Sequence, residues 1–211
     1  MNSEQDPFYR FISVASDGRT YLNLIYLVLM LPLGIIYFTI VVTGFSLSLG
    51  LILVIIGIVV AVLFLVLVRG ISFVHLSFAS ALLGFELPPE DEPQATTDGL
   101  LEKLKRILTD AKTYTSMIYM LIELPLGIIY FTLIITFLSI SVSFSVTPIL
   151  WLLAEEESWA IWDNDWLWQV NFGETLLLML GGVCLFFVTL HLGNLLAKVE
   201  QFLCKNLLTR L

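Results

Sequence analysis

The feature that constrains this chain most is an apolar run from Tyr21 to Val68 that holds no charged side chain. A helix that crosses a bilayer needs about 20 apolar residues. A run of about 48 residues is too long for one such helix and predicts two, joined by a tight turn. We place the first span near Leu24–Thr43, the turn at Thr43–Gly50 and the second span near Leu51–Val68.

Two further apolar segments follow, near Met117–Phe137 and Thr175–Leu192. Between them, Leu138–Leu153 carries a serine or threonine at every second position from 139 to 147, a period that favours an extended segment. Pro148 then allows a short helix to start again. The predicted fold is an all-α membrane protein with four transmembrane helices, arranged as two tandem parallel-repeat hairpins with cytoplasmic amphipathic helices.

The composition excludes several classes of protein. Hydrophobic residues make up 58% of the 211-residue chain and charged residues 13%, whereas soluble domains average about 45–50% and about 25%. An ordinary soluble enzyme and a disordered chain are therefore excluded. The net charge of −8 argues against a nucleic-acid partner. No phosphate loop, nucleophile elbow, zinc motif or catalytic carboxylate pair occurs, so the sequence predicts no enzyme, no cofactor and no metal.

The basic residues indicate how the chain is oriented. With four spans, all ten fall in the N-terminal tail, the central loop or the C-terminal tail. They are Arg10, Arg19, Arg69, Lys103, Lys105, Arg106, Lys112, Lys198, Lys205 and Arg210. Cytoplasmic loops carry the excess of lysine and arginine, so we expect a multi-pass plasma-membrane protein with both termini in the cytoplasm.

The chain contains an internal repeat. A shift of 93 residues superposes Asp17–Ser48 on Asp110–Ser141 without a gap, with 17 of the 32 positions identical. Because both copies start on the predicted cytoplasmic side, we expect a parallel repeat with a pseudo-twofold axis along the membrane normal. The repeated core holds Pro32 and Gly34 in one copy, and Pro125 and Gly127 in the other. The prolines should kink the helices and the glycines allow close approach; the pairs either shape the packing or act as hinges.

These features divide the single membrane domain, residues 1–211, into two parts. Residues 17–90 form the first hairpin and its linker, and residues 98–211 form the second hairpin with an acidic, tryptophan-rich outer loop at about 154–173. Amphipathic helices are predicted at 99–109 and 192–211, with a third candidate at 71–83. They either lie on the inner leaflet or form a docking face for a cytoplasmic partner.

Few residues stand out as candidates for chemistry. Glu123 is the one carboxylate inside an apolar run, and it is either a functional intramembrane acid or a side chain that snorkels to the inner surface. We expect His75 and His191 to be interfacial residues, and a bridge between Cys184 and Cys204 to be absent. Tryptophan and aspartate residues of the outer loop either form a lid that binds a ligand or a partner, or belong to an aromatic belt at the membrane interface. Its residues are Trp159, Trp162, Asp163, Asp165 and Trp166.

Several short motifs stand out along the chain. They are Leu31-Pro32-Leu33-Gly34-Ile35 and its copy from Leu124, Arg69-Gly70, Leu82-Leu83-Gly84, Leu87-Pro88-Pro89, Asp110-Ala111-Lys112-Thr113-Tyr114, and His191-Leu192-Gly193-Asn194-Leu195-Leu196-Ala197. Together they resemble those of the prokaryotic "putative sensor" membrane domain family. The resemblance covers about residues 17–208. In that family the domain stands at the N-terminus of many sensor histidine kinases and also occurs alone. The chain ends at Leu211 without kinase domains, so the resemblance implies a free-standing form.

We therefore expect a sensor-type integral membrane protein that relays an envelope or bilayer signal to a separate cytoplasmic partner. The expected partners are the lipid bilayer and a histidine kinase, a regulator or another membrane subunit, with self-association also open. The alternative is an accessory or scaffold subunit of a larger membrane complex, favoured by the scarcity of charges in the spans. A small transporter, suggested by the repeat and Glu123, is the third hypothesis.

Overall fold

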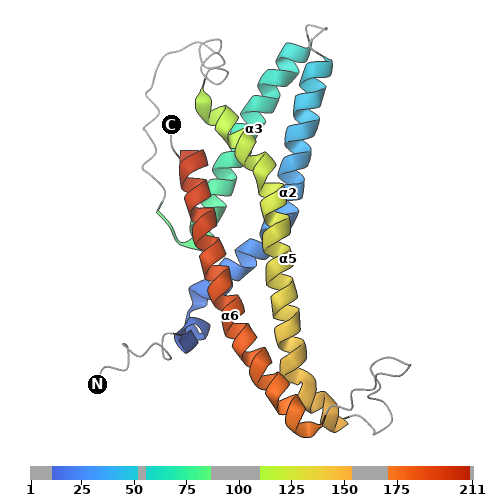
Figure 1. Cartoon of the computed structure of the whole chain (residues 1–211). Helices are drawn as coiled ribbons and strands as arrows, with labels where there is room; N and C mark the ends of the chain where they lie inside the picture. The colour runs from blue at the N-terminus through green and yellow to red at the C-terminus, as the bar shows by residue number, and fades with distance from the viewer. Residues whose placement is uncertain (1–10, 52–55, 87–109, 154–170, 210–211) are drawn as a thin grey trace, which may run out of the picture.

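The part of the chain that the structure describes consists of four long helices with short flanking turns (Figure 1). The computed structural model describes residues 11–51, 56–86, 110–153 and 171–209. The helices are α2 (Gly18–Gly50), α3 (Ile56–Leu83), α5 (Ala111–Leu153) and α6 (Phe172–Cys204). A short 3-10 helix, η2 (Val14–Ser16), precedes α2, and a π-helical turn, η3 (Lys205–Thr209), follows α6. All four long helices are long and apolar enough to cross a membrane, which confirms the predicted number of spans.

The first hairpin bends later than the sequence predicted. The turn expected at Thr43–Gly50 is wrong, because α2 continues as a helix to Gly50. The Ser48 hydroxyl donates to the Gly44 carbonyl oxygen at 2.7 Å, one turn back along the same helix. Serine and threonine can satisfy their hydroxyls in this way inside an apolar helix, so a Gly-Ser segment need not end it.

The same reason explains the second error in the spans. The extended segment predicted at Leu138–Leu153 is wrong, because α5 runs without a break from Ala111 to Leu153 and contains Pro148. The Thr147 hydroxyl donates to the Ser143 carbonyl oxygen at 2.9 Å. The Ser141 hydroxyl donates to the Gly182 carbonyl oxygen of α6 at 2.8 Å. The hydroxyl groups of this segment thus bond to carbonyl oxygens within α5 and on α6, and they do not indicate an extended segment.

Two of the predicted amphipathic helices are not separate elements. Residues 71–83 are the second half of α3, and residues 192–209 are the C-terminal part of α6 together with η3. Of their polar residues, His75 and Glu200 are buried among the other helices, whereas Lys198 is exposed. The third amphipathic helix, at 99–109, lies outside the described residues, as does most of the linker that ends at residue 90.

Helices α2 and α5 cross at the repeated Pro-Leu-Gly segments. A Cβ atom placed on Gly34 would lie 2.8 Å from the Cα atom of Leu124, and one on Gly127 would lie 2.7 Å from the Met30 carbonyl oxygen. The contacts are reciprocal, since Gly127 also faces Leu31, the residue equivalent to Leu124. Only glycine permits so close an approach of two helix backbones.

The crossing is antiparallel, so the predicted parallel repeat is wrong for this structure. Residues late in α2, Tyr37 and Val41, share a buried cluster with Met120, which is early in α5. The end of the α2–α3 hairpin and the end of the α5–α6 hairpin lie at opposite ends of the molecule (Figure 1). The charge count placed both hairpin turns on one side of the membrane, an arrangement that this structure does not have. The orientation in a membrane stays a prediction.

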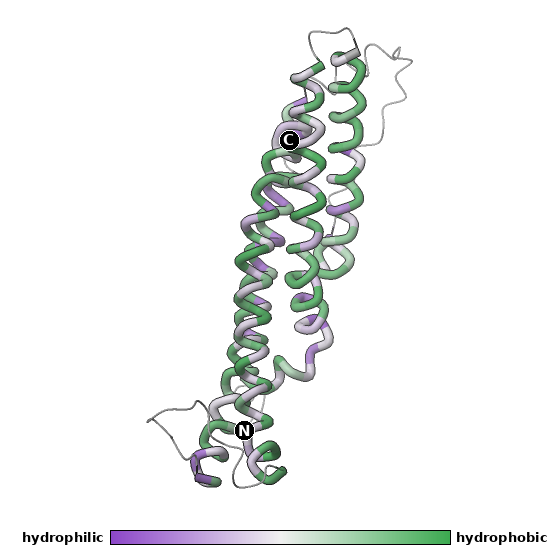
Figure 2. The backbone as a smooth tube through the Cα atoms, turned by 90° about the vertical axis from the view of Figure 1, so that its right-hand side faces the viewer, coloured by the Kyte–Doolittle hydropathy of each residue, from purple (hydrophilic) through white to green (hydrophobic). Residues whose placement is uncertain are grey.

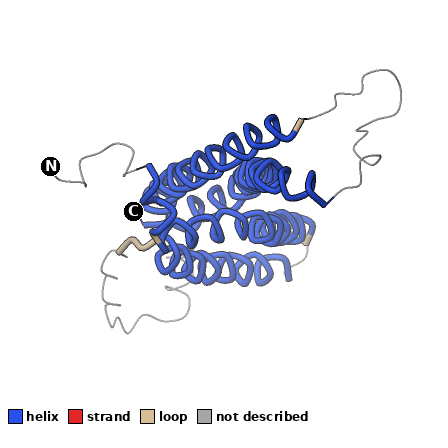
Figure 3. Tube along the Cα trace, turned by 90° about the horizontal axis from the view of Figure 1, so that it is seen from below, coloured by secondary structure: helices blue, strands red, loops and turns tan. Residues whose placement is uncertain are grey.

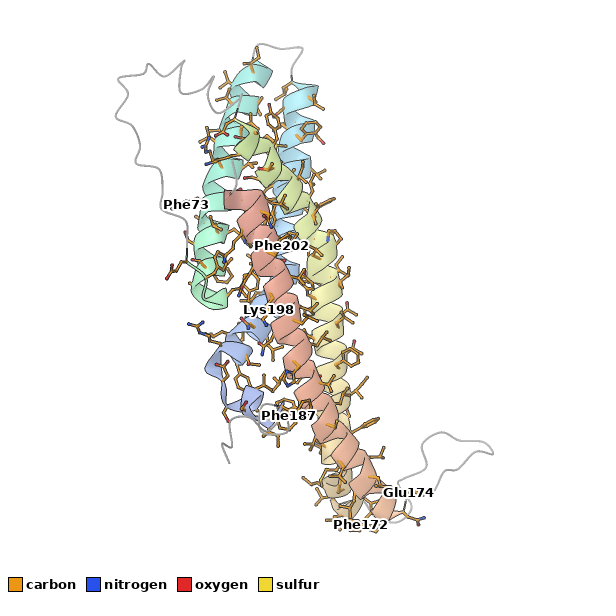
Figure 4. All side chains as sticks on the ribbon, turned by 60° about the vertical axis from the view of Figure 1, so that its left-hand side comes forward. Phe73, Phe172, Glu174, Phe187, Lys198 and Phe202 are labelled. Atoms are coloured by element: carbon orange, nitrogen blue, oxygen red, sulfur yellow. The ribbon has the colours of Figure 1, made fainter. Side chains whose placement is uncertain are left out.

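Polar contacts add a second link, between α2 and α6. The Asn23 amide donates to the Asn194 side-chain oxygen at 2.8 Å, and the Asn194 amide donates to the Thr20 hydroxyl at 3.0 Å. Apolar residues otherwise dominate all four helices (Figure 2), and the described segments are helices joined to short loops (Figure 3). Phe73 and Phe202 lie on the outer surface, 56% and 67% exposed (Figure 4). The apolar exterior fits a lipid environment.

The crossing predicts a specific effect of adding a methyl group. Gly127→Ala should lower the free energy of unfolding by about 1–3 kcal/mol, because its Cβ would press on the backbone of Met30. Gly181→Ala is the matched control: a Cβ there meets nothing within 4 Å, and alanine favours a helix by about 1 kcal/mol. Reversible unfolding in detergent measures both. Equal stability of the two variants would contradict the crossing.

The direction of the crossing can be tested by cysteine cross-linking in a chain whose native cysteines are serine. Val41→Cys with Met120→Cys should cross-link through a short bifunctional thiol reagent, because these residues share one buried cluster. Val41→Cys with Ile134→Cys, the pair that a parallel repeat would bring together, should not, since Ile134 belongs to the other cluster. The reverse pattern would restore the parallel arrangement.

Candidate functional site

Just beside this crossing, polar and ionisable side chains from all four long helices meet in the interior. We call them the central cluster. Its members are Tyr26 and Tyr37 from α2, His75 from α3, Tyr119, Glu123 and Tyr130 from α5, and Glu200 and Cys204 from α6. All are buried. A buried polar group must find partners to offset its lost hydration, so this cluster specifies how the four helices pack.

Two tyrosines of α2 hold the imidazole of His75 between them. Tyr26 Oη lies 3.3 Å from His75 Nε2, and Tyr37 Oη lies 3.2 Å from Nδ1. The tyrosines are three helical turns apart, so they project from one face of α2. His75 is only 1% exposed. The prediction that it is an interfacial residue is therefore wrong, because three neighbouring helices enclose it.

Tyr119 links α3 to α6. Its hydroxyl lies 2.8 Å from His75 Nε2, donates to Glu200 Oε1 at 2.5 Å, and lies 3.2 Å from Cys204 Sγ. Tyr119 is equivalent to Tyr26 in the repeat. Tyr130, equivalent to Tyr37, lies near Glu200, but its hydroxyl forms no hydrogen bond with any residue that the structure describes. Each copy of the repeat therefore supplies a pair of tyrosines to the centre: the first pair contacts the imidazole of His75, and Tyr119 of the second pair contacts both His75 and Glu200.

Glu123 faces the centre from α5. It is 1% exposed, and its Oε1 atom lies 3.5 Å from His75 Nδ1. The alternative in which this side chain snorkels to the inner surface is therefore wrong for this structure. Neither carboxylate oxygen of Glu123 accepts a hydrogen bond from any residue that the structure describes. Such a buried carboxylate is costly unless it gains a proton, a cation or a closer donor.

The remaining candidates lie apart from the cluster. Cys184 is exposed on α6, whereas Cys204 is buried, and the two are free thiols. His191 is on the exposed side of α6, with Nε2 3.2 Å from the Phe11 carbonyl oxygen. Pro32 and Pro125 lie within continuous helices, and the hinge role of the two Pro-Gly pairs stays a prediction. The lid residues Trp159, Trp162, Asp163, Asp165 and Trp166 lie outside the described residues.

Sequence reasoning found Glu123 but missed the residues that meet it. His75, Glu200 and Cys204 are distant in sequence, and the last two were assigned to an amphipathic tail. The signal that could have found the site is the repetition of Tyr26 and Tyr37 as Tyr119 and Tyr130. Four tyrosines at equivalent positions inside apolar helices need buried polar partners, and few residues in those helices can supply them.

Comparison with known proteins gives the family. The family model described as "Putative sensor" matches residues 26–208, most of the chain and all eight residues of the central cluster. The chain belongs to this family. Neither the comparison with curated proteins nor that with solved structures found a match. Within this Putative sensor domain, the matched range runs from Tyr26, the first tyrosine of the cluster, through η3 almost to its end.

The cluster of the sensor domain predicts the effect of removing one hydroxyl. Tyr119→Phe should lower the free energy of unfolding by about 1–3 kcal/mol, because it leaves Glu200 Oε1 and His75 Nε2 without their shortest partner. Tyr21→Phe removes an exposed hydroxyl that bonds the Ala15 carbonyl oxygen and should cost within about 0.5 kcal/mol. Chemical unfolding in detergent compares the two, and equal losses would count against a cooperative cluster.

Proposed function

We propose that this chain is a sensor-type integral membrane protein that relays an envelope or bilayer signal to a separate cytoplasmic partner. The family carries the sensor assignment. The observation that supports a relay is that one buried cluster joins all four long helices. A change in the partners of one cluster residue alters the packing of helices that reach both ends of the molecule. Packed elements with two discrete arrangements are the means by which proteins carry signals.

The proposed setting is the cell membrane. The distribution of basic residues predicts both termini on the cytoplasmic side, an orientation that needs both hairpin turns on one side of the membrane and therefore disagrees with the antiparallel crossing. The proposed partner is a histidine kinase or a regulator. The outer loop that contains Trp159, Trp162 and Trp166 is one proposed point at which the signal enters, and the bilayer itself is the other.

The central cluster weakens the argument for a scaffold subunit. That hypothesis relied on the absence of a charge network inside the spans, whereas the structure contains two carboxyl groups, an imidazole and a thiol in contact. The same finding supplies the transporter hypothesis with more polar residues inside the spans than Glu123 alone. A transporter would need a path from the cluster to the surface. The ionisable residues His75, Glu123 and Glu200 are at most 1% exposed, so no such path reaches them in this structure. A switch inside the bundle suits a closed cluster better than a permeation path.

Purification from native membranes in mild detergent tests the relay. We expect a histidine kinase or regulator to accompany the chain. In proteoliposomes, the ATP-dependent phosphorylation of that partner should change several-fold with His75→Gln, because this variant breaks the contacts of α3 with α2 and α5. Cys184→Ser, on the exposed face of α6, should leave phosphorylation unchanged.

Two results would contradict the proposal. Fixed-ratio recovery of subunits from a larger membrane complex, without a signalling protein, would establish the scaffold alternative. If His75→Gln folds as the native chain does and leaves phosphorylation of the partner unchanged, the central cluster has no part in the relay.

A further inference from the structure

Three side chains of the central cluster carry atoms that bind transition metals. They are Nε2 or Nδ1 of His75 on α3 and, on α6, a carboxylate oxygen of Glu200 and Sγ of Cys204. These atoms all lie within 4.8 Å of one another. Glu200 and Cys204 are four residues apart, so they project from one face of α6, one turn apart. Exposure is 1% for His75 and 0% for the other two.

The three donor atoms converge on one point. The Tyr119 hydroxyl is within hydrogen-bonding distance of all three, at 2.8 Å from His75 Nε2, 2.5 Å from Glu200 Oε1 and 3.2 Å from Cys204 Sγ. A tetrahedral zinc ion with bonds of about 2.0–2.3 Å has ligand atoms roughly 3.3–3.8 Å apart. An inward shift of about 1 Å would bring the donors to that spacing. The phenol oxygen stands at their meeting point, so it would either swing aside or become the fourth ligand.

Glu123 lies beside the imidazole nitrogen of His75 that does not face the convergence point. A histidine that binds a metal through one nitrogen commonly donates its other N–H group to a carboxylate, which fixes the ring. His75 presents Nε2 to the convergence point, and its Nδ1 lies 3.5 Å from Glu123 Oε1. Glu123 has no hydrogen-bond donor among the described residues. A small rotation would turn this contact into a hydrogen bond, in place of the one between Nδ1 and Tyr37 Oη.

We propose that His75, Glu200 and Cys204 form a binding site for one divalent transition-metal ion of the zinc type, with Glu123 orienting His75. The mixed nitrogen, oxygen and sulfur donors favour such an ion over Ca²⁺ or Mg²⁺, which take oxygen ligands. Binding releases the Cys204 thiol proton to solvent. The thiolate and the carboxylate then balance the two charges of the ion in an interior of low dielectric constant.

The site deepens the proposed function: its role as the sensing site rests on that function, whereas metal binding itself requires no partner. An ion held by α3 and α6 would draw these helices together and displace the Tyr119 hydroxyl from its three partners. The stimulus would then be the availability of a transition metal.

Cobalt is the probe, because a thiolate bound to Co²⁺ gives a charge-transfer absorption band in the near ultraviolet. The full chain is produced in Co²⁺-supplemented medium, purified in detergent and analysed for metal content and absorption. We expect about one cobalt ion per chain with this band. Cys204→Ser should abolish the band, and His75→Gln should lower occupancy at least tenfold. Cys184→Ser, the matched control on the same helix, should keep both.

Glu123→Gln separates an orienting residue from a ligand. It should retain the charge-transfer band but weaken Co²⁺ affinity by about 10- to 100-fold, the range seen when such carboxylates are removed. Native protein without bound cobalt, or a band that survives in Cys204→Ser, would overturn the site; the first result needs no variant to fold. A partner that responds normally to a metal-free chain would remove the sensing role of the site and leave the proposed function. Stoichiometric metal with no effect on any partner would do the reverse.

Discussion

The close contact of α2 and α5 at Gly34 and Gly127 is the constraint on which the rest of the structure depends. Because neither glycine has a side chain, the two backbones touch, and the residues on either side are brought within reach of the neighbouring helices. Tyr26 and Tyr37 lie on the two sides of this contact in α2, and Tyr119 and Tyr130 do so in α5. The tyrosine pairs therefore surround one centre, where α3 and α6 supply their partners.

This arrangement explains why so apolar a chain keeps ionisable residues in its interior. In an apolar interior, hydrophobic contacts between helices specify position weakly, since many faces of Leu, Ile and Val are interchangeable. Hydrogen bonds among His75, Tyr119 and Glu200 require one register of α3, α5 and α6. The cluster thus provides specificity in the packing, at the cost of burying groups that water would otherwise solvate.

The two copies of the repeat contribute differently to the central cluster. Equivalent tyrosines occur in both copies, but the first pair contacts the imidazole on α3, whereas Tyr119 of the second pair joins that imidazole to a carboxylate on α6. Met30 and Glu123 are equivalent in the repeat and both bring a backbone carbonyl to the helix crossing, but only Glu123 adds a carboxylate. In a duplicated hairpin, the two copies can keep the same helix contacts while different polar residues meet at the interface between them.

The sequence by itself determined the helices and the family. Apolar runs of sufficient length have no stable alternative to helices in a bilayer, since each backbone group must be paired within its own segment. It also identified Glu123, because a carboxylate among apolar residues is conspicuous. The ends of α2 and α5 could not be predicted, since hydroxyl groups that bond the preceding turn look the same in sequence as groups that end a helix.

Only the tertiary structure decided what meets Glu123. Glu200 and Cys204 form part of an amphipathic pattern, and that pattern is the same whether the polar face contacts lipid headgroups or three other helices. His75 lies more than a hundred residues from them. The antiparallel direction of the crossing was likewise beyond the sequence, because glycine permits close contact in either direction. The choice depends on contacts between side chains that no local spacing records.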